Sequence, residues 1–216
     1  MKIPFTQEEF VGVFKTYNET VFPIQGILYL FALIAVFNIL RKTTRSSVIV
    51  MALLSFLWIW MGVAYHIIHF SVINKAATFF GAIFIVQGIL FGYYANKMEF
   101  KFPSDTYGLT GFVLVFFALA VYPSIAYLIG HVYPYAPTFG VPCPTTIFTF
   151  GILLLTEKKC ATILLVIPGL WSIVGASAAS NLGFYEDIGL VISGIITIVM
   201  LLKRKQKLQR EVLKYA

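Results

Sequence analysis

The fold is decided by one uncharged stretch, TYGLTGFVLVFFALAVYPSIAYLIGHVYPYAPTFGVPCPTTIFTFGILLLT, which runs from Thr106 to Thr156. Its 51 residues contain no Asp, Glu, Lys or Arg. A membrane-spanning helix needs roughly 20 mainly apolar residues to cross about 30 Å of hydrocarbon. The stretch therefore has room for two such helices and a connector, and we predict the helices at residues 109–129 and 144–156.

The rest of the chain has the same apolar character. Of its 216 residues, 59% are hydrophobic and only 12% are charged, against about 25% charged residues in an ordinary soluble domain. A soluble domain of this size could not hide so much apolar surface. The composition excludes a soluble enzyme, a disordered chain and a nucleic-acid-binding domain. It predicts an all-α integral membrane protein.

The other uncharged stretches complete a single transmembrane domain over residues 1–216. We predict further spans at 21–40, 46–69, 76–94, 161–180 and 183–202, which makes seven in all. The span at 144–156 is short, since its residues at 1.5 Å rise cover only about 20 Å. Either that helix starts earlier, or the proline-rich loop at 131–144 dips into the membrane. Such a loop must be buried in protein or line a wet cavity, so we expect it to cover or line a site.

The positions of lysine and arginine predict the orientation. Thirteen of the 16 follow the first, third, fifth and seventh spans, and six of these lie in the basic tail at 203–216. The other side has only Lys2, Lys15 and Lys75. Cytoplasmic loops carry an excess of positive charge. We therefore expect a protein of the cytoplasmic membrane with its N-terminus outside and its C-terminus in the cytoplasm.

Residues 1–20 predict a short interfacial helix rather than a signal peptide, because they are charged and lack an apolar core. Thr6 and Glu9 have the spacing of a capping box, and Phe5 and Phe10 occupy the positions of a hydrophobic staple. One face of this helix is apolar and is formed by Phe10, Val13, Phe14 and Tyr17. We expect that face to lie on the outer membrane surface or on the other helices.

The reactive side chains concentrate at the predicted outer level of the membrane. The candidate binding residues there are His66, His69, His131, Cys143, Thr145, Asn181, Glu186 and Asp187. Neutral imidazole is a common ligand of transition metals, so the three histidines form a candidate metal site. The alternative is that they bond lipid headgroups or backbone. At i and i+3, His66 and His69 would share one face of an α-helix.

The remaining candidates also have two interpretations each. Cys143 lies at a predicted helix N-terminus, which favours a reactive thiolate, but it could equally be a small residue packed at a helix start. Glu186 and Asp187 are functional candidates or simply favourable charges at the start of the seventh span. Gln25 and Gln87 are polar residues within spans, where interhelical hydrogen bonding is the common role.

Several sequence pieces resemble a family of small prokaryotic membrane proteins catalogued as a domain of unknown function, whose members are sometimes labelled permeases. The resemblance spans nearly the whole chain. It is carried by P-F-T-x-E-x-F at Pro4–Phe10, Y-N at Tyr17–Asn18, G-V-A-Y-H at Gly62–His66, the block Tyr133–Thr149, G-x-S-A-A at Gly175–Ala179 and E-D-x-G-L at Glu186–Leu190. It implies a polytopic membrane fold and transfers no activity.

Three functions are compatible with these features. The first is a permease for a small solute or ion with a polar site on the outer face. The second is a membrane-embedded hydrolase that uses a transition metal bound by His66, His69 and His131, with Glu186 or Asp187 as a further ligand or base. The third is a non-catalytic membrane partner or assembly protein. We favour the permease. The expected partners are the lipid bilayer, a small solute or ion, and further copies of the chain in a homo-oligomer, but no nucleic acid.

Overall fold

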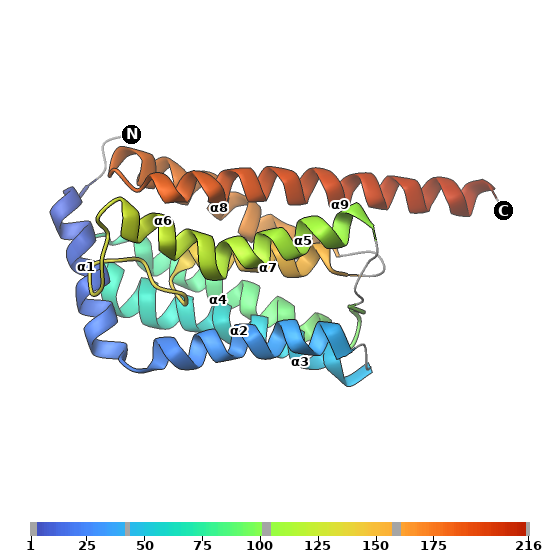
Figure 1. The fold of residues 1–216 in the computed structure, drawn as a ribbon, viewed down its shortest axis with the longest axis horizontal. Coiled ribbons are helices and arrows are strands. Elements are labelled where there is room, and N and C mark those ends of the chain that lie inside the picture. Colours follow the sequence, from blue (N-terminus) through green and yellow to red (C-terminus); the bar gives the residue numbers. More distant parts are fainter. Residues whose placement is uncertain (1–3, 42–43, 101–104, 157–160, 215–216) are drawn as a thin grey trace.

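The computed structural model describes residues 4–41, 44–100, 105–156 and 161–214. Within these residues the regular structure is helical, and β-type pairing is limited to two isolated bridges, Phe100–Thr156 and Phe139–Val141. The long helices run side by side, whereas α1 (Gln7–Val21) lies across one end of the bundle (Figure 1). We call this the α1 end.

The helical segments follow the predicted spans closely. They are α2 (Ile24–Arg41), α3 (Thr44–Trp60) with η1 (Met61–His69) and η2 (Phe70–Val72), α4 (Ala76–Tyr94), α5 (Thr106–Phe116) with η3 (Phe117–Val121) and α6 (Tyr122–Leu128), α7 (Pro142–Leu154), η4 (Thr162–Leu165) with α8 (Val166–Asn181), and η5 (Tyr185–Asp187) with α9 (Ile188–Lys214). The last helix continues through the basic segment that follows the predicted seventh span, so residues 203–214 are helical rather than a loose tail.

Five of the described helical stretches are long and apolar enough to cross a membrane. They are Ile24–Arg41, Arg45–Val72, Ala76–Tyr94, Thr106–Leu128 and Tyr185–Arg210. The apolar helices Pro142–Leu154 and Thr162–Gly175 are shorter. A helical, membrane-type fold is therefore confirmed, whereas seven complete spans and their orientation stay predictions.

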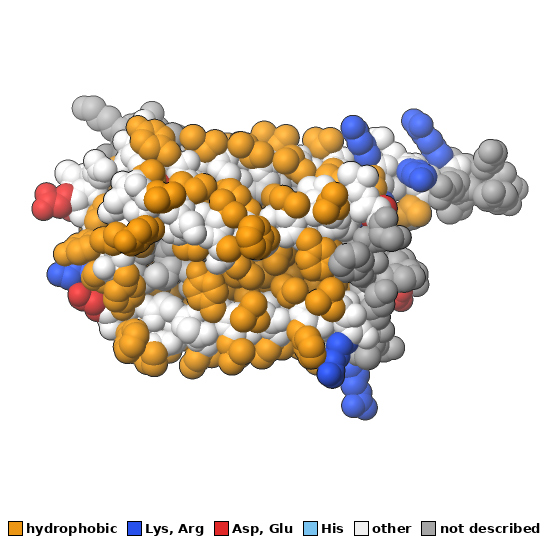
Figure 2. Space-filling view, in the orientation of Figure 1, with side chains coloured by type: hydrophobic (Ala, Val, Ile, Leu, Met, Phe, Trp, Pro, Cys, Tyr) orange, Lys and Arg blue, Asp and Glu red, His pale blue; other side chains and the backbone are white. Residues whose placement is uncertain are grey.

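The surface of the bundle fits this fold. Figure 2 shows hydrophobic side chains spread along the sides of the bundle, with most of the visible Lys and Arg side chains at the end opposite α1. Exposed apolar side chains such as Leu33, Phe79 and Ile195 belong to several different helices. Soluble monomers rarely expose apolar patches of this extent. A bilayer supplies the apolar surroundings that these side chains need.

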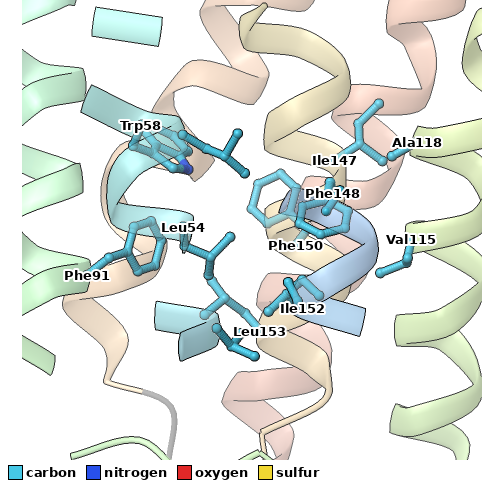
Figure 3. Packing of buried hydrophobic residues seen from close by; sticks show 14 of the residues in the cluster. Leu54, Trp58, Phe91, Val115, Ala118, Ile147, Phe148, Phe150, Ile152 and Leu153 are labelled. Carbon is cyan, nitrogen blue, oxygen red and sulfur yellow. The ribbon is translucent and has the colours of Figure 1, made fainter. Parts of the chain in front are cut away.

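Helix α7 lies at the centre of the core. From Pro144 to Leu154 all of its residues are buried. Figure 3 shows Phe148 and Phe150 of α7 between Trp58 on one side and Val115 on the other. The Trp58 indole also donates a 3.0 Å hydrogen bond to the hydroxyl of Thr149. The helix also carries two further buried threonines, Thr145 and Thr146.

Paired glycines bring neighbouring helices into backbone contact. A Cβ atom on Gly111 of α5 would lie 2.9 Å from the Gly151 carbonyl oxygen of α7, and one on Gly151 would lie 2.8 Å from the Gly111 oxygen. Gly62 of η1 and Gly81 of α4 meet in the same reciprocal way, at 2.7 Å each. Small residues at such crossings are typical of membrane helices, where close van der Waals packing drives association.

Candidate functional site

The amphipathic helix α1 closes one end of the bundle. Its start forms the predicted capping box, in which the Glu9 amide donates to the Thr6 hydroxyl at 3.2 Å and the Thr6 amide donates to the Glu9 carboxylate at 2.7 Å. The staple is also present, because the Phe5 and Phe10 rings stack 5.7 Å apart. Phe14 is buried against Tyr65 and Phe184. Of the two positions considered for this face, the structure places it on the other helices.

Asn18 ties α1 to the proline-rich loop. Its amide nitrogen donates to the carbonyl oxygens of Pro134 and Ala136 at 2.6 and 2.9 Å. Its side-chain oxygen accepts a 2.7 Å hydrogen bond from the Thr138 hydroxyl. The Asn18 backbone oxygen accepts from the Gln25 amide at 2.8 Å. These bonds satisfy carbonyl groups that the loop itself leaves unpaired. Helix α1 and the loop at 131–144 therefore form one joined layer at the α1 end of the bundle, which we call the cover.

The adjacent Tyr17 joins the cover to the helices of the bundle. It is fully buried, and its hydroxyl accepts a 2.8 Å hydrogen bond from the Trp60 indole. The same hydroxyl donates to the Gly140 carbonyl oxygen at 3.4 Å. Burial raises the pKa of the Tyr17 hydroxyl above its ordinary value, and the Trp60 hydrogen bond offsets only part of that rise. Tyr17 is therefore a neutral, structural group.

Two adjacent carboxylates are buried beneath the cover. Glu186 and Asp187 lie in η5, and their residues are only 2% and 4% exposed. The Glu186 carboxylate is 2.8 Å from Nδ1 of His131, whose ring stacks on Phe184 at 4.2 Å. The Tyr122 hydroxyl donates to Asp187 at 2.6 Å. The chain thus brings α6, the start of the loop and η5 together around two acids.

The two carboxylates lack a full complement of positive charge. Within the described residues the ion-pair partner of the two acids is His131, which contacts Glu186 and is charged only when protonated. The second oxygen of Glu186 is buried without a hydrogen-bond partner. Asp187 has the neutral Tyr122 hydroxyl and lies within hydrogen-bonding reach of the Cys143 thiol. Burying a carboxylate without compensation is costly, so the site favours binding of a proton or another cation.

A small cavity opens beside Asp187. It has a volume of about 40 Å³, and its lining includes Phe14, Tyr65, Cys143, Trp171 and Asp187. Pro137 and Val141, from the proline-rich loop and its junction with α7, also line it, so this part of the chain borders a cavity. A cavity needs roughly 10–15 Å³ to hold one water molecule. This one can therefore hold a few water molecules or a small ligand.

Cys143 lies at the start of α7, as predicted, but its surroundings do not favour a thiolate. The Asp187 carboxylate is adjacent, and a second negative charge there would be repelled. The imidazole of His131 is engaged by Glu186 instead. A nucleophilic cysteine needs a base or a positive group beside it. Cys143 therefore acts in this site as a neutral thiol.

The expected metal site finds no support in the described residues. Among the described residues, no group of three His, Cys, Asp or Glu side chains could hold a metal ion. His69 contacts the Ala64 carbonyl oxygen through Nδ1 at 2.6 Å. His66 is fully buried with neither ring nitrogen bonded, and its ring lies 4.5 Å from Phe84 and 5.1 Å from Trp171. His131 pairs with Glu186 elsewhere.

The separation of His66 from His69 has a local cause. Residues 61–69 form the π-helix η1 rather than an α-helix, and the wider π turn separates residues at i and i+3 that an α-helix would stack. The expectation that His66 and His69 share one face depended on α-helical spacing. His66 turns into the aromatic core, while His69 contributes to an open groove against α1.

The other predicted site residues have structural roles. The Thr145 hydroxyl accepts from the Gly140 amide at 3.0 Å and joins the loop to α7. Asn181 is exposed and donates to the Ser177 carbonyl oxygen of its own helix, so it does not belong to the cluster. Gln25 lies in the first turn of α2, not mid-span. Gln87 is fully buried and donates to the Leu164 carbonyl oxygen at 3.1 Å.

Sequence reasoning missed the aromatic members of the site. Tyr122 lies within an apolar stretch next to Pro123, and the sequence does not distinguish it from the other aromatic residues of the predicted spans. Tyr65 and Trp171 line the cavity from η1 and α8. A buried tyrosine usually has a hydrogen-bond partner for its hydroxyl. That rule predicts a polar partner for Tyr122, but it does not say that the partner is Asp187.

The fold and the site define a class of protein: an α-helical bundle of membrane-spanning character with a buried acidic cluster at one end. More particularly, the chain belongs to the family of unknown function DUF6064, whose family model matches residues 7–212. Neither a comparison with curated proteins nor one with solved structures found a match.

Proposed function

We propose that the chain is a small-solute or ion permease of the cytoplasmic membrane, with its N-terminus outside and its acidic cluster at the outer face. The observation that carries this proposal is the buried cluster of Glu186, Asp187 and His131, which lacks balancing charge. Ionisable residues within membrane segments commonly mark pathways for ions or substrates. A metal-dependent hydrolase finds no support in the geometry of the described residues.

Buried polar atoms deeper in the bundle support a transport role. Thr146 of α7, Gln87 of α4 and Thr197 of α9 each have a buried oxygen without a hydrogen-bond partner. Thr146 lies near the start of its helix at the α1 end, whereas Gln87 and Thr197 lie roughly 15 Å further along their helices. Such groups are costly unless they are bonded part of the time. Water or a passing solute would satisfy them.

Solute flux into liposomes tests this function. The full-length protein is reconstituted, and uptake of labelled urea, glycerol, rubidium and methylammonium is compared with uptake by protein-free liposomes. We expect at least one solute to enter faster with protein. Gln87→Leu should reduce that flux because it replaces the mid-bundle polar group with an apolar one. Asn38→Leu is the matched control, since Asn38 bonds only the Ile34 carbonyl oxygen of its own helix.

Two results would overturn the permease. One is that no solute exceeds the protein-free rate. The other is that Gln87→Leu and Asn38→Leu change the flux equally, because the effect would then not depend on the buried position. The oligomeric state of the reconstituted protein should be measured alongside by crosslinking, so that flux is expressed per functional unit.

A further inference from the structure

We propose that the outer site binds a small ammonium-type cation, held in the cavity between the Asp187 carboxylate and the aromatic rings of Tyr65 and Trp171. This inference rests on the proposed function and gives the substrate class of the same site. It is carried by three features of the described residues: the charge of the cluster, the chemistry of the cavity wall and the size of the cavity.

The charge of the cluster calls for a cation. Glu186 and Asp187 are adjacent in η5 and both are more than nine-tenths buried. When both carboxylates are ionised, one negative charge stays unbalanced among the described groups even with His131 protonated. The second oxygen of Glu186 is also buried without a partner, but Glu186 does not line the cavity, whereas Asp187 does. An ammonium ion in the cavity would supply a positive charge and an N–H donor to the Asp187 carboxylate.

The cavity wall favours an ammonium ion over a bare metal ion. Most of the lining is aromatic or aliphatic, with Asp187 and the Cys143 thiol as its polar members alongside Tyr65 and Trp171. Hard cations such as Mg²⁺ and Ca²⁺ require six or more oxygen ligands, which this lining does not offer. Aromatic faces attract ammonium groups directly, and tryptophan does so most strongly.

The size of the cavity limits the ligand. Its volume of about 40 Å³ exceeds the roughly 10–15 Å³ that one water molecule needs. Ammonium and methylammonium are small enough for this space. Phe10 and Phe14 of α1 also border the cavity. The N-terminal helix therefore forms part of the wall that a ligand at this site would contact.

Direct binding of methylammonium tests the inference without requiring transport. Calorimetric titration of methylammonium chloride into purified full-length protein, at constant ionic strength set with sodium chloride, should show one saturable site. Asp187→Asn should weaken binding by about tenfold or more, because a charge-assisted hydrogen bond is lost. Asp105→Asn is the matched control, since Asp105 is exposed at the start of α5 and Asn also caps a helix.

A second variant keeps the test decisive if Asp187→Asn does not fold. Trp171→Leu removes one aromatic face and leaves both carboxylates, and we expect it to weaken methylammonium binding by a smaller factor. Circular dichroism and thermal melting establish folding for each variant. Absence of saturable binding in the unmodified protein, or equal binding in Asp187→Asn and Asp105→Asn, would overturn the inference.

The outcomes separate this inference from the permease itself. Flux of urea or rubidium without methylammonium binding would overturn the ligand class and leave the permease intact. Methylammonium binding without flux of any solute would support the ligand class and overturn transport. Binding of sodium as tightly as methylammonium would also contradict the inference. The aromatic wall would then not distinguish between the two cations.

Discussion

At the residue scale, Tyr122 has the most direct effect on the acidic cluster. Its hydroxyl is fully buried and donates a 2.6 Å hydrogen bond to Asp187. A short bond to a carboxylate is among the stronger hydrogen bonds in proteins. The neighbouring carboxylate of Glu186 takes its own bond from His131. Tyr122 therefore stabilises a charge that no lysine or arginine of the described residues contacts.

Tyr122→Phe tests that role. The substitution keeps the ring and leaves Asp187 without its strongest donor, so the free energy of unfolding should fall by about 1–3 kcal/mol. Reversible unfolding in mixed detergent micelles measures the change. Tyr127→Phe is the control, because Tyr127 lies on the same helix, α6, with an exposed side chain. Equal stability of the two variants would show that the Tyr122 bond does not matter.

Sequence alone located part of this cluster. The order of spans and charges predicts one common level for His131, Cys143, Glu186 and Asp187, and the structure brings these four side chains into one region. Their pairing could not be predicted, because position along a helix gives depth and not direction around the bundle. The direction of His66 and His69 could not be predicted either. They lie in the π-helix η1, and no simple residue pattern predicts a π-helix.

At the element scale, the short helix α7 depends on how closely its neighbours approach. Gly151 lies against the backbone of α5, and the Arg204 guanidinium of α9 donates to the Leu154 and Thr156 carbonyl oxygens at the end of α7. Those carbonyls have no partner within the helix. Close glycine packing along one side and a positive charge at one end thus stabilise an apolar helix that is shorter than the five span-length helical stretches.

Gly151→Val should separate α5 from α7. The added side chain would begin 2.8 Å from the Gly111 carbonyl oxygen and 2.9 Å from the Val115 amide, both of them backbone atoms that cannot turn away. We expect loss of about 1–3 kcal/mol of stability, as in other overpacked cores. Gly26→Ala is the control: nothing lies within 4 Å of its added Cβ, so stability should hold or rise slightly. Thermal melting in detergent distinguishes them.

The elements themselves were largely predictable from local patterns. The capping box and staple of α1 involve residues close in sequence, and both are confirmed. The predicted span 76–94 matches α4. The division of the fourth span at η3 was less accessible, although Pro123 gives a reason for it: proline lacks an amide hydrogen and disturbs the helix just before it. The role of α7 as the central helix needed the structure.

At the scale of the whole molecule, composition decides the class of protein and charge predicts its orientation. The apolar sides of the bundle fit a bilayer, and most visible Lys and Arg side chains lie at the end opposite α1 (Figure 2). Five described helices have the length and composition of membrane spans. The acidic cluster and the cavity lie at the α1 end. The proposed permease, with its site at the outer face, requires that this end faces the outside.

Cysteine labelling in right-side-out membrane vesicles tests that requirement most directly. Val132→Cys lies at the α1 end and Lys207→Cys lies on α9 at the other end, and both side chains are exposed. Each is introduced after Cys143 and Cys160 are changed to serine. A membrane-impermeant maleimide should label Val132→Cys in intact vesicles and Lys207→Cys only after permeabilisation. The reverse pattern, or labelling of both in intact vesicles, would contradict an outer-facing site in a spanning bundle.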